Sequence, residues 1–187
     1  MHGRGSHGKP RRPRRRGDYD AGIRSGARPR QAMIFICDVM LGKLARYLRI
    51  LGFDARYIRQ GDDPRSFPAP SPKILFLTKR KTGTVRPHTI VVQGNDPEEQ
   101  LLGIKDFIEP YIDPAALMTR CLDCNTVLID VPKDEIEPFV PEYVYHHHDR
   151  FTTCPSCKKV YWEGSHADEM HAWMERVKAK KHEKVPF

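Results

Sequence analysis

The sequence predicts an α/β fold with a mostly parallel sheet, followed by a small metal-stabilised module. Short apolar runs alternate with helical patterns over residues 33–108, an order typical of parallel strands joined by covering helices. Two CxxC pairs follow at residues 121–124 and 154–157, as in a four-thiolate zinc site. With 187 residues, 39% of them hydrophobic, the chain can bury one core of ordinary size and a small satellite module.

The first predicted elements are a strand and a helix. The apolar run 33–37 ends at Asp38, and residues 40–51 then place leucines and an alanine at helical spacing. Gly52 fits the left-handed residue just past a helix end. Basic side chains occupy the other side of this helix, which predicts an exposed basic face made of Lys43, Arg46 and Arg49.

Three further strands and a second helix are predicted downstream. The strands cover residues 53–58, 73–77 and 89–92. Asp96 as N-cap, Pro97 at the first helical position and Glu99 at the third predict a helix that ends near residue 108. The proline-rich connection 61–72 is incompatible with a regular helix.

The positive charge is concentrated at the start of the chain. The formal net charge is +8, and residues 1–32 contain ten Lys or Arg and two Asp, so the remaining residues are neutral overall. A segment so basic and poor in apolar residues predicts a disordered tail. Such a tail binds phosphate backbones through counterion release, without sequence preference. The alternative is that the protein starts at Met33 and the tail is not translated.

The neutral remainder is itself polarised. Residues 43–86 contain eleven basic and three acidic side chains, and residues 96–142 contain twelve acidic and three basic ones. If these segments fold to different sides, the basic side attracts an anionic partner; for any single charge, a solvated helix face is the simpler interpretation. The longest apolar runs are far shorter than the roughly 20 residues of a membrane-spanning helix, which excludes a transmembrane protein.

The cysteines predict a structural zinc site. Its ligands are Cys121, Cys124, Cys154 and Cys157; because thiolates fill all four positions, none remains open for a catalytic water. Cys37 is predicted to be buried in the core. Reduced thiolates place the protein in a reducing compartment, the cytoplasm. The run 146–148 of three histidines is predicted to be an exposed loop, because consecutive residues cannot all face one ion.

These patterns divide the chain into four parts. A disordered tail (1–32) precedes an α/β domain (33–118), a zinc module (119–178) and a second basic tail (179–187). The zinc module ends in a closing helix that Ser165 and Asp168 can cap and that continues through Trp173 to Val177.

Four blocks of sequence resemble one family, the C-terminal ribonuclease domain of the Mut-seven type exonucleases. The blocks are FICDVMLGKLARYLRILGFD at 35–54, Gln100-Leu101, RCLDCN at 120–125, and Cys154 through YWEGSH at 161–166. The resemblance implies a PIN-like, three-layer α/β domain with a zinc ribbon. It also implies single-stranded or structured RNA as substrate and phosphodiester cleavage that depends on divalent metal ions.

The resemblance also indicates candidate catalytic residues and one departure. Asp38 matches the family's first acid, at the carboxyl end of a strand where such sheets place ligands, and Asp62 or Asp63 falls near a second acidic position. Together they would hold Mg²⁺ or Mn²⁺ for in-line displacement. The third strand of the family is followed by Leu-Thr-Arg-Asp, whereas this chain has Arg80 at the position of that carboxylate. The helix before this strand is replaced by the proline-rich residues 67–72.

Two functions of different class follow. The first is an RNA-binding protein of the PIN-like ribonuclease type, either a metal-dependent endoribonuclease or a protein whose active site is degraded. The second is a non-catalytic zinc-ribbon module that associates with ribosomes or another ribonucleoprotein, with the acidic segment 96–142 binding protein. Besides the tail, the side chains expected to contact RNA are Lys43, Arg46, Arg49, Lys79, Arg80 and Lys81.

Overall fold

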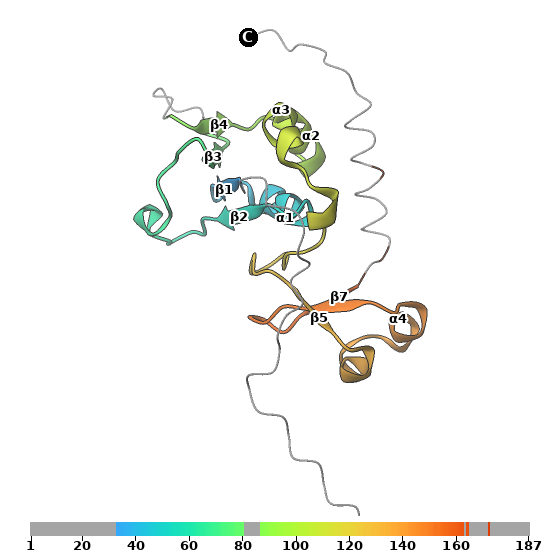
Figure 1. Ribbon diagram of the computed structural model, residues 1–187. Coiled ribbons are helices and arrows are strands. Elements are labelled where there is room, and N and C mark those ends of the chain that lie inside the picture. The colour runs from blue at the N-terminus through green and yellow to red at the C-terminus, as the bar shows by residue number, and fades with distance from the viewer. Residues whose placement is uncertain (1–32, 81–86, 163, 165–171, 173–187) are drawn as a thin grey trace, which may run out of the picture.

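The structure of the protein is a computed structural model that describes residues 33–80, 87–162, 164 and 172 (Figure 1). The two predicted tails, 1–32 and 179–187, lie outside the described residues, as does almost all of the predicted closing helix at 165–177. Within the described residues, no helix is both long enough and apolar enough to cross a membrane.

A four-stranded parallel sheet forms the first part of the molecule, which confirms the predicted α/β class. The strand order is β2-β1-β3-β4, and every neighbouring pair is parallel. The strands and helices of this part are β1 (Ile34–Cys37), α1 (Gly42–Ile50), β2 (Asp54–Tyr57), β3 (Ile74–Thr78), β4 (Thr89–Val91), α2 (Pro97–Gly103) and α3 (Lys105–Ile108), and the 3-10 turns are η1 (Pro64–Ser66), η2 (Glu109–Tyr111) and η3 (Pro114–Ala116).

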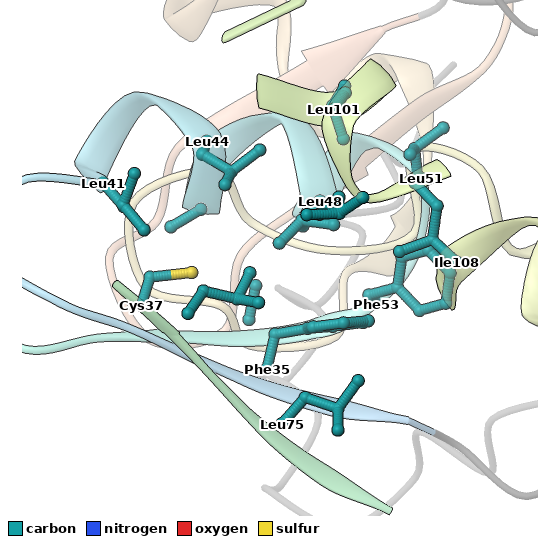
Figure 2. Packing of buried hydrophobic residues seen from close by; sticks show 14 of the residues in the cluster. Phe35, Cys37, Leu41, Leu44, Leu48, Leu51, Phe53, Leu75, Leu101 and Ile108 are labelled. Atoms are coloured by element: carbon teal, nitrogen blue, oxygen red, sulfur yellow. The ribbon is translucent and has the colours of Figure 1, made fainter. Parts of the chain in front are cut away.

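The core lies between the sheet and its helices. Leucines of α1 pack onto Phe35, Cys37 and Leu75 of the sheet, and Leu101 and Ile108 close the cluster from α2 and α3 (Figure 2). Each large apolar side chain buried in this way stabilises the fold by about 1.5–3 kcal/mol. Cys37 is fully buried, as predicted, and burial raises the pKa of its thiol to about 12.

The helices of this part lie on one side of the sheet, and the connection that contains η1 lies on the other (Figure 1). As predicted, the proline-rich connection forms no α-helix; its regular structure is the single turn η1. The second predicted helix ends early, because at Ile104 the backbone N–H binds the carbonyl of Leu101, three residues back, and α3 then starts at Lys105. Gly103, a poor helix former, precedes the break.

An antiparallel sheet of order β5-β6-β7 forms the second part. Its elements are β5 (Ile129–Val131), η4 (Lys133–Glu135), η5 (Glu137–Phe139), α4 (Glu142–His147), β6 (Phe151–Thr153) and β7 (Val160–Trp162). His146 and His147 are exposed, as predicted, but the prediction of a loop is wrong. Both residues belong to α4, where the ring of His147 stacks on Tyr143 one turn earlier.

Candidate functional site

The four cysteines of the CxxC pairs converge on one point, although 29 residues separate the pairs. Their Sγ atoms all lie within 4.8 Å of one another. In a tetrahedral zinc site with Zn–S bonds near 2.3 Å, the sulfur atoms are separated by slightly less than 4 Å. Cys121 and Cys154 are buried and Cys124 and Cys157 lie at the surface. The cluster therefore fits a zinc ion held by four thiolates, in the predicted zinc-ribbon module.

The two CxxC turns have the same backbone geometry. In each, the second cysteine's N–H donates to the first cysteine's Sγ, at 3.3 Å for Cys124 and 3.5 Å for Cys157. The residues that follow, Asn125 and Lys158, have φ of +64° and +65°, which turns the chain back. Both bond through N–H to the carbonyl of the first cysteine in their own turn. Each turn thus directs two sulfur atoms to the same point.

Hydrogen-bond donors favour the thiolate form of Cys121. Burial opposes ionisation of this thiol, but the hydroxyl of Tyr161 and the N–H groups of Cys124 and Asp123 outweigh it and lower the pKa to about 6. Tyr161 Oη lies 3.1 Å from Cys121 Sγ. Burial and this same contact raise the pKa of the Tyr161 hydroxyl, so it stays a donor. Thiolates are the form that binds metal.

A buried arginine joins the first CxxC turn to the α/β domain. The Arg49 guanidinium donates to the carbonyl of Ala55 at 2.9 Å and to those of Leu122 and Asp123 at 2.6 and 3.1 Å. Arg49 is only 6% exposed, and burial lowers the pKa of its guanidinium. The prediction that Arg49 belongs to an exposed basic face is therefore wrong, and its role as an RNA contact stays a prediction. Helical spacing placed it opposite the leucines, but the docked turn covers that position.

Asn125 and Arg120 make further contacts between the two parts. Asn125 Oδ1 accepts from the N–H of Ala55 at 3.2 Å, and its Nδ2 donates to Asp54 Oδ1 at 2.6 Å. Arg120 donates to the carbonyl of Gly52 at 3.1 Å. The side chain of Asn125 thus bonds to one backbone group and one side chain of β2. Asp54 therefore accepts a hydrogen bond at the joint between the two parts.

Asp38 lies at the carboxyl end of β1 and is 7% exposed. Its carboxylate accepts hydrogen bonds from other groups of the protein. Its Oδ1 accepts from the N–H of Met40 at 2.9 Å, and its Oδ2 accepts from the hydroxyl of Thr78 and from the N–H of Lys79, the latter at 3.1 Å. A carboxylate offers about four lone pairs. These three bonds leave Asp38 one lone pair, on Oδ1, for any further partner.

The other two predicted acids cap local turns. Asp62 accepts from the N–H of Arg59 at 2.8 Å, and Asp63 accepts from the N–H and Nε of Arg65 at 2.9 and 3.2 Å. Both are exposed. Among the described residues, the four cysteines are the only group of three or more His, Cys, Asp or Glu placed to share one metal ion. Asp38, Asp62 and Asp63 do not converge in the structure.

The remaining predicted RNA contacts lie in two places. Lys43 and Arg46 are exposed on α1, and Arg46 pairs with Asp123 at 3.3 Å. Lys79 and Arg80 follow β3 at the same sheet edge as Asp38, and Lys79 Nζ reaches Asn95 Oδ1 at 3.4 Å. Lys81 lies outside the described residues.

The structure adds a pocket of about 440 Å³ between the end of β2, the η1 connection and the first CxxC turn. Sequence reasoning missed this pocket, because its lining comes from three separate segments. The local sequence indicates the pocket only through two aromatic residues, Tyr57 before the proline-rich connection and Phe67 within it. The lining residues are Arg49, Arg56, Tyr57, Arg59, Asp62, Phe67, Asp123, Cys124 and Asn125.

The parallel sheet and the four-cysteine ribbon together define an α/β zinc-ribbon architecture. The family model for the Mut7-C RNAse domain matches residues 33–174, and the chain belongs to this family. Comparison with curated proteins and with solved structures finds no significant match. The family membership confirms the resemblance found in the sequence and supports a ribonuclease-like, RNA-related function.

Proposed function

We propose that the protein binds single-stranded or structured RNA at the carboxyl edge of its parallel sheet without cleaving it efficiently. The observation that carries this proposal is the environment of Asp38. A two-metal nuclease needs several carboxylates aimed at shared ions. Here the protein's own donors occupy three of the four lone pairs of Asp38, and the cationic Arg80 follows at the same edge.

The cations at this edge support binding. Lys79 and Arg80 are adjacent in sequence, and Arg80 is exposed. The backbone N–H of Arg80 donates to Thr78 Oγ1 at 3.0 Å, and the same hydroxyl donates to Asp38. These two hydrogen bonds fix the backbone of Arg80 close to Asp38. Phosphate contacts from such cations fix the position of a strand without reading its sequence.

The cysteine cluster has a structural role in this proposal. The zinc ion would be held by Cys121, Cys124, Cys154 and Cys157. Because thiolates fill all four positions, the ion would cross-link the two CxxC turns and bind no catalytic water. Zinc then fixes the turn that docks on Arg49 and β2. Its need for reduced thiols agrees with a cytoplasmic location.

A second candidate function is attachment to a ribonucleoprotein through the zinc module. Phe139 and Tyr143 are 72% and 69% exposed, and the neighbouring Glu137 and Glu142 are exposed as well. Exposed aromatic residues among acids suit a protein contact with a basic partner. Loss of a co-purifying ribonucleoprotein from a Phe139→Ala, Tyr143→Ala variant that still binds free RNA would favour this candidate.

The test of the main proposal uses the full zinc-loaded chain with labelled single-stranded RNA. We expect binding that weakens with salt, and no strong stimulation of cleavage by Mg²⁺ or Mn²⁺. Lys79→Gln combined with Arg80→Gln should weaken binding, whereas Lys73→Gln, which removes an exposed charge before the opposite end of β3, should not. Efficient cleavage that Asp38→Asn abolishes would contradict the proposal.

A further inference from the structure

We propose that the pocket beside β2 is a subsite for one nucleotide of a single RNA strand, taking the base on its aromatic residues and the phosphate on its guanidinium groups. This inference rests on the proposed function and adds to it a second, separate contact region. A volume of about 440 Å³ lies within the range of small-ligand sites. The pocket residues that carry the argument are Arg56, Tyr57, Arg59 and Phe67.

One aromatic wall of the pocket is held in place before any ligand binds. The hydroxyl of Tyr57 donates to the carbonyl of Val39 at 2.9 Å. A Cβ added at Gly42 would lie 3.2 Å from Cζ of the same ring, so the absence of a side chain at Gly42 leaves room for the ring. A ring fixed in this way can stack a base with little loss of conformational entropy.

The second ring of the pocket is that of Phe67, which belongs to the proline-rich connection, and charged groups complete the lining. Phe67 is half-buried and is absent from the apolar core cluster. The Arg59 side chain is exposed and makes no hydrogen bond or ion pair with the described residues. Arg56 pairs with Asp54 at 3.3 Å while remaining 42% exposed. The guanidinium without a partner among the described residues is therefore that of Arg59, and aromatic rings beside such a cation are the chemistry that single-stranded RNA requires.

The pocket adjoins the edge proposed for RNA. Tyr57 ends β2 in register with Cys37, so the pocket and Asp38 lie at the carboxyl ends of neighbouring strands. Lys79 and Arg80 follow β3, on the other side of β1. Neighbouring strands are about 4.8 Å apart, so cations flank Asp38 on both sides over roughly 10 Å. A single strand of RNA that crosses the edge would therefore meet both groups, which favours a strand over a free mononucleotide.

The first CxxC turn forms the remaining wall. Asp123, Cys124 and Asn125 line the pocket. The Asp123 carboxylate is paired with Lys159 and with Arg46, and the side-chain polar atoms of Asn125 are bonded to Ala55 and Asp54. The turn therefore shapes the pocket and leaves ligand contacts to the arginines and rings.

The test measures binding of a short labelled oligouridylate to the full zinc-loaded chain. Phe67→Ala should weaken it by about fivefold or more, the lower range for loss of a stacking aromatic residue, and Phe67→Trp should restore it. Arg59→Gln should weaken binding and flatten the slope of log affinity against log salt by about 0.7. The matched control is Arg65→Gln, which removes the same charge from a side chain that is 92% exposed outside the pocket.

The outcomes separate this inference from the proposed function. If Phe67→Ala and Arg59→Gln bind as the wild type does while Lys79→Gln with Arg80→Gln binds more weakly, the pocket inference fails and the proposed function stands. If none of these variants changes binding, both fail. Uridine monophosphate that binds the pocket as tightly as the oligouridylate does would overturn the assignment to an RNA strand.

Discussion

The two regions predicted from the sequence to bind metal are built in opposite ways. At the cysteine cluster, two backbone turns aim four sulfur atoms at one point, within 4.8 Å of one another. At the sheet edge, the Asp38 carboxylate is aimed at the N–H groups of Met40 and Lys79 and at the hydroxyl of Thr78. In one region the side chains converge on a common point, whereas in the other the carboxylate is bonded to donors of the protein itself.

This difference shows what distinguishes a metal site from a set of suitable residue types. The carboxylates of Asp38, Asp62 and Asp63 are suitable ligands for magnesium, but each accepts a hydrogen bond from a nearby backbone N–H. Buried or capping carboxylates are stabilised by such bonds without any metal. The cysteine sulfurs also accept N–H bonds, yet their shared orientation leaves a common point for a cation. Convergence therefore separates the two regions better than residue identity does.

The largest expected effect comes from removing a ligand of the converging site. Cys121→Ser or Cys154→Ser should unfold the 119–162 module, because zinc binding supplies about 10–16 kcal/mol in small zinc-dependent units. The parallel sheet should remain folded. Elemental analysis should give one zinc per chain for the wild type, with amide protection lost only in the module of each variant. Cys37→Ala is the control and should keep its zinc; less than one zinc per reduced wild-type chain would contradict the assignment.

A smaller effect is expected at the joint between the two regions. Arg49→Met removes the donor shared by three carbonyls, and we expect a loss of about 2–4 kcal/mol in the free energy of unfolding. The matched control is Arg46→Met on the same helix, an exposed ion pair worth about 0–1 kcal/mol. Denaturant unfolding of both variants measures the difference. Equal losses would show that burial of Arg49 adds nothing to stability.

A third prediction concerns the sheet edge. Arg80→Asp supplies the carboxylate expected from the family pattern, but Asp62 and Asp63 do not join Asp38 in a metal-binding group. We therefore expect weaker RNA binding, with a salt slope flatter by about 0.7 or more, and little cleavage stimulated by manganese. Arg80→Gln should weaken binding less. Strong metal-dependent cleavage by Arg80→Asp would show that one missing ligand alone separates this edge from a working nuclease.

Local patterns predicted the strands, α1, the cap of the second helix and the cysteine ligands, because each depends on residues close in sequence or on a fixed spacing. Gly52 has the left-handed backbone, φ +88°, that its place after the helix predicts. The burial of Arg49 could not be predicted, because its partners Leu122 and Asp123 lie more than 70 residues away. The pocket depends on the same docking of distant segments.

The partners of Asp38 show a related limit. The sequence places an acid at the end of β1, but the hydroxyl of Thr78 meets it because β3 lies beside β1 in register. That contact depends on the strand order. A family pattern can assign a role to an acid, whereas only the packed sheet shows which donors already bind it.

The smallest expected effect concerns Asp96, a carboxylate that, like Asp38, accepts hydrogen bonds from backbone N–H groups. Asp96 caps α2, and its N–H bonds from Glu99 and Glu98 hold the pKa of this carboxyl below its ordinary 3.8. A lowered pKa stabilises the fold above pH 3.8, and that stability is lost as the pH falls through the lowered pKa. Asp96→Asn keeps the cap oxygen without the charge. The stability gap between wild type and variant should therefore be constant near neutrality and close in acid.

Acid also protonates thiolates and releases zinc, but it does so in both proteins, so the difference between them isolates Asp96. The local measurement is NMR titration of the Glu98 and Glu99 amide protons. Their shifts should contain a component that follows the lowered pKa in the wild type and that is missing in Asp96→Asn. A wild-type midpoint at or above 3.8 would contradict the capping role.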